Sequence, residues 1–491
     1  MLNQSSSKNR IENNGTLVLK GVKLIDVVYD RHQDDVTIII ENGIITSIEN
    51  ESVLTIPINA NVLYLQGKTV IPGLIDSHLH LSQSGVDDFL KPYAERMNTK
   101  LKRNAYITLR SGVTTVRNMP GGAGKEIFKF REKVKQGKVL GPRILLSGPA
   151  LAPSYGYFSL KRFFPPNPLA MAILSRIFGA HGLAIDVDSP EEARETVNKL
   201  KREGVDFIKT VTPGAHIPFT EKDEKLKEKL LKKGIKLETI EASMQPEVLE
   251  AIVEEAHKND LKVAAHTIFW TKGFNEAIKA GVDSVEHTPF GLIDDETFEL
   301  MKSNNTYWTP TAYCFYNWTN FIDNQEQYDS IEIKELIPEP FHALGKKSLD
   351  KVREDIKSGE DLVWGNFYEK MQPFKEIYFP NNFKNAVEKG IKIVAGVDGG
   401  ASGAGYVPHG QLHKELKLFA EHGMSKIEVI KTATINAAEL LGLEKKLGSI
   451  EVGKLGDFVV LESNPLEDIT NLSQINCVIK AGSVVYEKES S

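Results

Sequence analysis

The sequence has little of what secreted or disulfide-stabilised proteins need. Only two of its 491 residues are cysteine. Because Cys314 and Cys477 are far apart, they argue against a disulfide framework and fit a reducing compartment. The polar stretch 1–15 lacks the apolar core of a secretion signal. We therefore expect a cytoplasmic protein in which residues 1–15 form a disordered N-terminal segment.

Long hydrophobic runs and a strong charge of one sign are also missing. The apolar stretch 169–178 is interrupted by Arg176 and is too short to span a bilayer. The 60 basic and 66 acidic residues are interspersed and give a net charge of -6. This balance provides neither a basic patch for nucleic acid nor a polybasic arm for a membrane. We expect a small-molecule substrate, no nucleic acid or membrane partner, and a homo-oligomer.

Both ends of the chain have the pattern of short β-strands. Within 16–65, apolar runs alternate with turns, and Asn42-Gly43 predicts a hairpin because both central positions of a type I′ turn need positive φ. Residues 448–486 have the same pattern. Neither end has enough strands to bury a sheet face alone. We therefore expect residues 16–69 and 446–491 to meet and form one small β-sandwich.

The middle of the chain, 70–445, alternates apolar runs with amphipathic helical stretches, which is typical of parallel strands with crossover helices. Eight such runs predict an α/β protein with a closed (β/α)8 TIM barrel. They lie near 74–80, 114–119, 143–150, 205–211, 262–267, 284–289, 307–311 and 391–399. The aromatic-rich segment 312–384 is too long for an ordinary connection, so it predicts a helical insertion at the barrel mouth.

The run 70–80 ends in two histidines one residue apart, His78 and His80. Side chains at i and i+2 of a strand point to the same face, so both imidazoles can reach one point just past the strand end. A chance pair or a buried structural histidine would give the same spacing. The interpretation as a metal site therefore depends on the other strands.

Four more strand ends carry a possible metal ligand: Lys209, His266, His287 and Asp398. Each has an ordinary alternative. Lys209 could lie along the barrel rim, the histidines could be hydrogen-bonded core residues, and Asp398 could hold a turn. Barrel enzymes place their active sites at the carboxyl ends of the strands. One such residue at the same end of each of five strands has no explanation in packing.

Several motifs together carry a resemblance to a known superfamily. They are the run 72–80 ending in His-Leu-His, Asp-Phe-Ile-Lys at 206–209, Val-Ala-Ala-His at 263–266, Ser-Val-Glu-His at 284–287 and the segment 433–457. From about 21 to 469 the sequence resembles the amidohydrolase superfamily, within it the imidazolonepropionase-like and metal-dependent prolidase-like hydrolases. The resemblance implies a barrel clasped by a small β-sandwich and a binuclear centre, usually zinc. It also implies that His78, His80, His266, His287 and Asp398 are ligands and that a carboxylated Lys209 bridges the metals.

The chemistry of these residue types agrees with the resemblance. An ammonium group among imidazoles and two divalent cations would be repelled, so a lysine there must change its charge. The pKa of a lysine falls readily on burial, which frees the amine to add carbon dioxide. The resulting carbamate can bridge two cations roughly 3.5–4 Å apart. We expect two divalent metal ions, Zn²⁺ before Mn²⁺ or Co²⁺, and a carbamate on Lys209.

The expected activity is metal-dependent hydrolysis of a C–N bond by a bridging water, with Asp398 as general base. The family's Gly-Gly-His-Gly and Ala-Thr-Gly-Gly segments are replaced here by 153–157 and 210–215, so the substrate stays open. Dipeptides or N-acyl amino acids stand ahead of a cyclic amide such as imidazolonepropionate. A catalytically silent scaffold is the alternative from another class. Tyr155 and Arg117 could bind a substrate carboxylate, and Arg117 could equally hold a structural ion pair.

Overall fold

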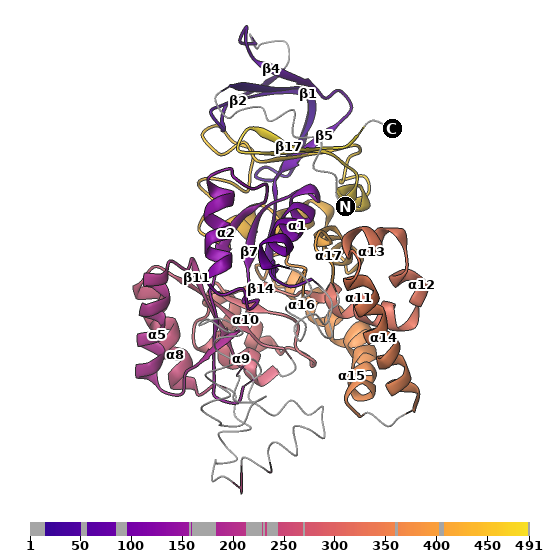
Figure 1. Cartoon of the computed structure of the whole chain (residues 1–491). Helices are drawn as coiled ribbons and strands as arrows, with labels where there is room; N and C mark the ends of the chain where they lie inside the picture. The colour runs from indigo at the N-terminus through magenta and orange to yellow at the C-terminus, as the bar shows by residue number, and fades with distance from the viewer. Residues whose placement is uncertain are drawn as a thin grey trace.

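The computed structural model describes residues 15–50, 56–84, 96–156, 159, 183–212, 228, 231–232, 244–268, 271–358, 362–401 and 407–489, with the backbone alone at 362–366. Apart from Gly15, the predicted disordered segment 1–15 lies outside these residues. Figure 1 shows a small sheet at one end of the molecule, an α/β region in the middle and a group of helices beside it. No described helix is long and apolar enough to cross a membrane, and both cysteines are buried and free.

The small sheet combines strands from both ends of the chain (Figure 1). Its eight strands are β1 (Thr16–Asp26), β2 (Arg31–Glu41), β3 (Ile44–Asn50), β4 (Asn61–Tyr64), β5 (Thr69–Pro72), β15 (Phe458–Leu461), β16 (Ile475–Lys480) and β17 (Ser483–Glu487). Their order is β17-β16-β15-β5-β1-β2-β3, and β4 pairs with β1. The expected hairpin joins β2 to β3, with φ of 52° at Asn42 and 81° at Gly43.

The expected β-sandwich is not shown, because the strand pairing joins all eight described strands in one sheet. The reason is that β5 pairs with β1 on one side and runs antiparallel to β15 on the other, so the two chain ends join edge to edge. Alternating apolar residues of both ends, including Leu19, Ile38 and Phe458, form a common buried cluster. Burial of this shared face stabilises the pairing of the two ends.

The central region contains two parallel sheets. One consists of β6 (Leu74–Leu79), β7 (Val113–Asn118) and β8 (Arg143–Leu146). The other has the order β10-β9-β11-β12-β13-β14, with β9 (Ala150–Ala152), β10 (Ala184–Asp186), β11 (Phe207–Val211), β12 (Lys262–His266), β13 (Ser284–Glu286) and β14 (Tyr307–Thr309). The strands β7, β11 and β12 are almost wholly buried, as expected for parallel strands covered by helices.

Helices follow most of these strands: α1 (Met97–Arg110), α2 (Lys125–Lys135), α5 (Pro190–Glu203), α8 (Pro246–Lys258), α9 (Thr271–Lys279), α10 (Asp295–Ser303), α16 (Phe379–Glu388), α17 (Leu412–Glu421), α18 (Lys426–Thr432) and α19 (Ile435–Leu440). The start of α5 follows from its sequence. Ser189 accepts a hydrogen bond from the backbone of Glu192, and Pro190 occupies the first turn.

The predicted eighth strand, 391–399, is an extended segment with isolated bridges rather than a regular strand. It nevertheless connects the two sheets. Val394 N donates to Trp308 O of β14 at 2.9 Å, and Ser77 N of β6 donates to Ala395 O at 2.9 Å. Across the other seam, Asp206 N donates to Leu146 O at 2.7 Å. The described strands thus form two parallel sheets, and the assigned pairing stops short of one closed eight-stranded barrel.

Residues 312–358 and 362–378 form the group of helices beside the central region (Figure 1). They are α11 (Ala312–Asp323), α12 (Gln325–Tyr328), α13 (Ile331–Leu336), α14 (Phe341–Ser358), α15 (Leu362–Pro373) and the π-helical turn η1 (Phe374–Tyr378). Aromatic rings connect this group to the loop after β13. The ring centroid of Phe290 lies 5.6 Å from that of Phe315 and 5.2 Å from that of Phe374.

Candidate metal centre

His78 and His80 meet Asp398 at the carboxyl end of β6. His78 lies within the strand and His80 is the first residue after Leu79. Their Nε2 atoms lie 3.5 Å and 3.1 Å from the same oxygen, Oδ1 of Asp398. The ligand-type atoms of the three residues lie within 4.8 Å of one another, and all three residues are buried. Two imidazoles and a carboxylate so placed can hold a divalent cation.

The backbone fixes where Asp398 stands relative to β6. Asp398 N donates to His78 O at 2.8 Å. The buried carboxylate of Asp76 accepts from the backbone N–H of His78 at 3.1 Å and of Val397 at 3.3 Å. At Gly396 an added Cβ would stand 2.7 Å from the Cβ of His78. Only a glycine lets the Asp398 segment approach β6 this closely.

His266 and His287 come from the neighbouring strands β12 and β13. His266 ends β12, and His287 directly follows β13 with a φ of 73°. His287 Nε2 lies 2.8 Å from His266 Nδ1. The ring centroid of His287 is 4.4 Å from that of His266 and 4.8 Å from that of His78. The structure therefore brings all four predicted histidines together.

Three of the histidines have their Nδ1 atoms engaged away from the cluster centre. His78 Nδ1 lies 2.7 Å from Glu286 Oε2, and His80 Nδ1 lies 2.6 Å from the carbonyl oxygen of Pro120. His287 Nδ1 lies 2.7 Å from Thr311 Oγ1. For His78 and His80, a partner at Nδ1 fixes the tautomer and leaves the lone pair of Nε2 for a metal. In His287, by contrast, Nε2 also has a protein neighbour, His266 Nδ1 at 2.8 Å.

Lys209 lies on β11, beside β12, and is 2% exposed. Its Nζ has no hydrogen-bond partner among the described residues. Burial lowers the pKa of Lys209 to about 8, although Glu286 and Asp398 counteract this effect. A buried amine without a partner is costly in a protein interior. A lowered pKa favours the neutral amine, which is the form that adds carbon dioxide. The carbamate itself stays a prediction.

The surroundings favour the neutral forms of His78 and His266 and the charged form of Asp398. Burial, followed by the charge of Lys209, lowers the pKa of His78 to about 4 and that of His266 well below its ordinary value. Burial on its own would raise the pKa of Asp398, but His78 and His80 hold it below its ordinary value. Neutral imidazole and ionised carboxylate are the forms that bind metal ions.

Arg117 and Tyr155, the two predicted substrate-binding residues, come from other strands than the histidines. Arg117 is 3% exposed, and its guanidinium donates to Ser77 O, Ser284 Oγ and Glu286 Oε1 at 2.6–2.9 Å. These contacts agree with the ion-pair alternative and give no support to its prediction as a substrate ligand. Tyr155 follows β9, is buried, and has a φ of 66°. Its role in substrate binding stays a prediction.

Sequence reasoning missed Glu286, Asp76 and Thr311 as members of the site. The sequence could have indicated Glu286, directly before His287, and Asp76, two residues before His78, because a charged side chain on a buried strand needs a partner. The contact of Thr311 could not be predicted from the sequence. It depends on a φ of 46° at a β-branched residue, which only the surrounding packing can impose.

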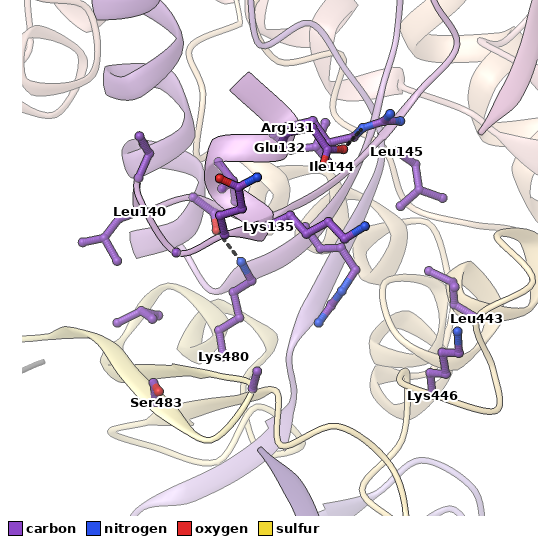
Figure 2. Close-up of a pocket in the computed structure, with 18 of the residues that line it drawn as sticks. Arg131, Glu132, Lys135, Leu140, Ile144, Leu145, Leu443, Lys446, Lys480 and Ser483 are labelled. Carbon is purple, nitrogen blue, oxygen red and sulfur yellow. Dashed lines mark hydrogen bonds and ion pairs between the residues drawn. The ribbon is translucent and has the colours of Figure 1, made fainter. Parts of the chain in front are cut away.

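A large groove lies elsewhere, at the amino ends of β8 and β11 (Figure 2). Arg131, Arg143 and Lys446 are among its lining residues, together with Lys480 from the small sheet. None of the predicted ligands, nor Arg117 or Tyr155, lines this groove. Several of its charged groups have protein partners, such as Arg143, whose Nη1 donates to Asp457 Oδ2 at 2.8 Å. We therefore assign it no part in the candidate metal centre.

The profile of the amidohydrolase family matches residues 69–485. The chain belongs to the amidohydrolase family. The chain is 41% identical over 71 residues to a probable imidazolonepropionase of Xenopus laevis, a match that covers 13% of this chain and 16% of that protein. The chain thus spans about a sixth of the length of this curated relative.

Two solved structures resemble the whole chain. One is a Xaa-Pro dipeptidase with methionine bound in its active site, with a TM-score of 0.69 and 27% identity over 96% of this chain and 100% of that chain. The other is a putative prolidase from Bifidobacterium longum, with a TM-score of 0.68 and 25% identity over 96% of this chain and 95% of that chain. The mixed α/β fold is thus that of the prolidase-like amidohydrolases.

Proposed function

We propose that the protein is a metal-dependent hydrolase that cleaves a C–N bond of amide or peptide type. The observation that carries the proposal is the Nζ of Lys209, which is buried without a partner among the described residues and within electrostatic reach of His78 and His266. Hydrogen-bonded buried charges are ordinary, whereas a buried amine that has no hydrogen-bond partner and lies near His78, His266 and His287 points to a missing ligand. The family membership supports the same activity.

The residues present fit two divalent cations, with Zn²⁺ as the best match to the donor set. His78, His80 and Asp398 would hold one cation, and His266 and His287 would hold the other. Lys209, as a carbamate, would lie between them. When bound, such cations polarise a carbonyl group and lower the pKa of a water molecule.

Asp398 is the general base in this proposal. The imidazoles of His78 and His80 favour its ionised form, so its carboxylate can accept a proton at neutral pH. The oxygen of water forms a bond to the carbonyl carbon, and the C–N bond breaks. Asp398 passes the proton of the water to the leaving nitrogen, so the products are an acid and an amine. No serine or cysteine nucleophile takes part.

The proposed substrates are dipeptides or N-acyl amino acids. The likeness to a Xaa-Pro dipeptidase over nearly the whole chain supports them. A cyclic amidase is the second candidate, favoured by the local similarity to a probable imidazolonepropionase. A catalytically silent scaffold is the third. Hydrolysis of dipeptides, N-acyl amino acids and cyclic amides by the zinc-loaded protein distinguishes these candidates, and about two zinc ions per chain excludes the scaffold that has lost its metals.

Asp398→Asn tests the mechanism directly. Loss of a general base lowers turnover by about 10²–10⁴-fold, so we expect kcat to fall by that factor while most of the zinc is retained. Asp283→Asn is the matched control, since Asp283 precedes β13 at its opposite end and contacts His257 at 2.9 Å. Near-normal turnover in Asp398→Asn would contradict the proposed role.

We further propose that the two parallel sheets and the segment 391–399 close into a (β/α)8 barrel over residues 70–445. Its helical insertion would span about 312–384, and residues 16–69 and 446–491 would form a separate small β domain. The hydrogen bonds from 391–399 to β14 and β6 support this closure. We also propose a cytoplasmic homo-oligomer acting on a small molecule, which light scattering coupled to size-exclusion chromatography and localisation of the tagged protein would test.

A further inference from the structure

Glu286 is a fully buried carboxylate that contacts a candidate ligand without facing the cluster centre itself. It ends β13 and is 0% exposed. Its Oε2 lies 2.7 Å from His78 Nδ1. Its Oε1 accepts from Arg117 Nη2 at 2.6 Å and from Ser284 Oγ at 2.6 Å. Every described contact of this carboxylate therefore fixes its orientation toward His78.

Arg117 completes the arrangement from β7. Nε donates to Ser77 O at 2.6 Å, and Nη1 donates to Ser284 Oγ at 2.9 Å. The guanidinium carbon also lies 5.5 Å from the ring centroid of Phe207. Arg117 thus connects β6, β11 and β13, and its fork of donors is engaged by protein atoms. A planar, permanently charged group suits this position, because it supplies a counter-charge and several directed hydrogen bonds together.

We propose that Arg117 and Glu286 are positioning residues that orient His78 for the metal. Glu286 accepts the Nδ1 hydrogen of His78, so that the Nε2 lone pair is directed toward Asp398, and Arg117 holds Glu286 in place. Neither residue touches the substrate. This inference rests on the proposed function only in needing a cation at His78, and it replaces the substrate-binding role predicted for Arg117.

The test measures cation affinity rather than turnover. Metal-free wild type and variants are titrated with Zn²⁺ against a chromophoric chelator, and the Co²⁺-loaded proteins are compared by their visible spectra. Loss of a group that supports a metal ligand typically weakens metal binding about 10–100-fold. We expect Glu286→Gln to reach that range and to alter the Co²⁺ spectrum. Arg117→Lys, which keeps the charge but loses the fork, should weaken binding less.

Arg143→Lys is the matched control. Arg143 is also a strand arginine that donates to a carboxylate, Asp457, but it starts β8 at the opposite end. The affinity of the Arg143→Lys variant for Zn²⁺ should stay within about twofold of that of wild type. Wild-type affinity and an unchanged Co²⁺ spectrum in folded Glu286→Gln would overturn the proposal.

Folding is monitored separately, because a purely structural role would lower the melting temperature of the metal-free protein and leave the affinity of the folded fraction unchanged. That result also overturns the proposal. If Glu286→Gln does not fold, Ser284→Ala removes a single support of Glu286 and should still weaken Zn²⁺ binding measurably. A wild type that binds zinc but hydrolyses nothing would sink the proposed function and leave the positioning of His78 intact.

Discussion

The candidate metal centre and the groove differ in how they accommodate a lysine. Lys209, in the middle of β11, has no hydrogen-bond partner among the described residues. Lys480 lines the groove at the amino ends and donates to Gly141 O at 2.8 Å (Figure 2). Burial lowers the pKa of each lysine to about 8. A backbone carbonyl therefore accepts a hydrogen bond from Lys480, whereas no described residue forms one with Lys209.

Two arginines that line the groove also have hydrogen-bond partners within the protein. Arg143 donates to Asp457 at 2.8 Å, and Arg131 donates to Asp206 at 2.7 Å. Charges paired in this way need no ligand from outside the protein. A buried polar group that lacks a hydrogen-bond partner is therefore a better marker of a functional site than burial or a shifted pKa alone.

Lys209→Met gives the largest expected effect in this comparison. It replaces a partnerless amine with an apolar chain of similar length, so the metal-free protein should fold and melt no lower than wild type. The bridging anion would be lost, and turnover should fall by about 10³-fold, since metal catalysis contributes several kcal/mol. Metal analysis should give fewer ions per chain. Unchanged metal content and turnover in Lys209→Met would contradict the proposal that Lys209, unlike Lys480, belongs to the metal site.

Lys480→Met should change stability and its pH dependence instead of turnover. Because the pKa of Lys480 falls from 10.5 to about 8 in the folded protein, the unfolded chain binds more protons between these pH values. The free energy of unfolding of wild type should therefore rise from pH 8 to 10.5, and this contribution should vanish in the variant. Discounted for partial exposure, the difference is about 1–3 kcal/mol.

Urea unfolding at pH 7 and pH 10 measures that difference. Lys446→Met is the control, because Lys446 is an exposed residue of the same groove. A pH dependence in Lys480→Met equal to that of wild type would show that Lys480 does not carry the effect.

Asp206→Ala should have the smallest effect. The Asp206 carboxylate accepts from Arg131 and, at 2.8 Å, from Leu146 N at the seam between β8 and β11. It is 37% exposed, so we expect a loss of about 1 kcal/mol in the free energy of unfolding. Turnover should stay within about twofold of wild type, although Lys209 is only three residues away. A large loss of zinc would show that the groove and the candidate metal centre are coupled.

Much of the candidate site could be predicted from the sequence because the geometry of β-strands is regular. The i, i+2 spacing placed His78 and His80 on one side, and the ends of parallel strands placed His266 and His287 near each other. The parallel strands and the joining of the two chain ends also followed from sequence patterns. The roles of the ligands and the domain boundaries stay predictions.

The rest depended on long-range contacts. The segment 391–399 has the composition of a strand but makes isolated bridges, because its neighbours on both sides and the close approach at Gly396 decide its geometry. The β-sandwich stays a prediction for a similar reason, since a count of strands does not say whether they meet edge to edge or face to face. The contacts of Arg117 with Glu286 cross 169 positions and have no local signal.

The pairing of β5 with β15 has a consequence for synthesis on the ribosome. Strand β5 ends at Pro72, and its partner β15 begins at Phe458. At a translation rate of roughly 5–20 residues per second, β15 is synthesised on the order of 20–80 s after β5. During that time an apolar edge stands open to neighbouring chains. Chaperone demand in the cell should therefore rise when translation of the distal half is slowed.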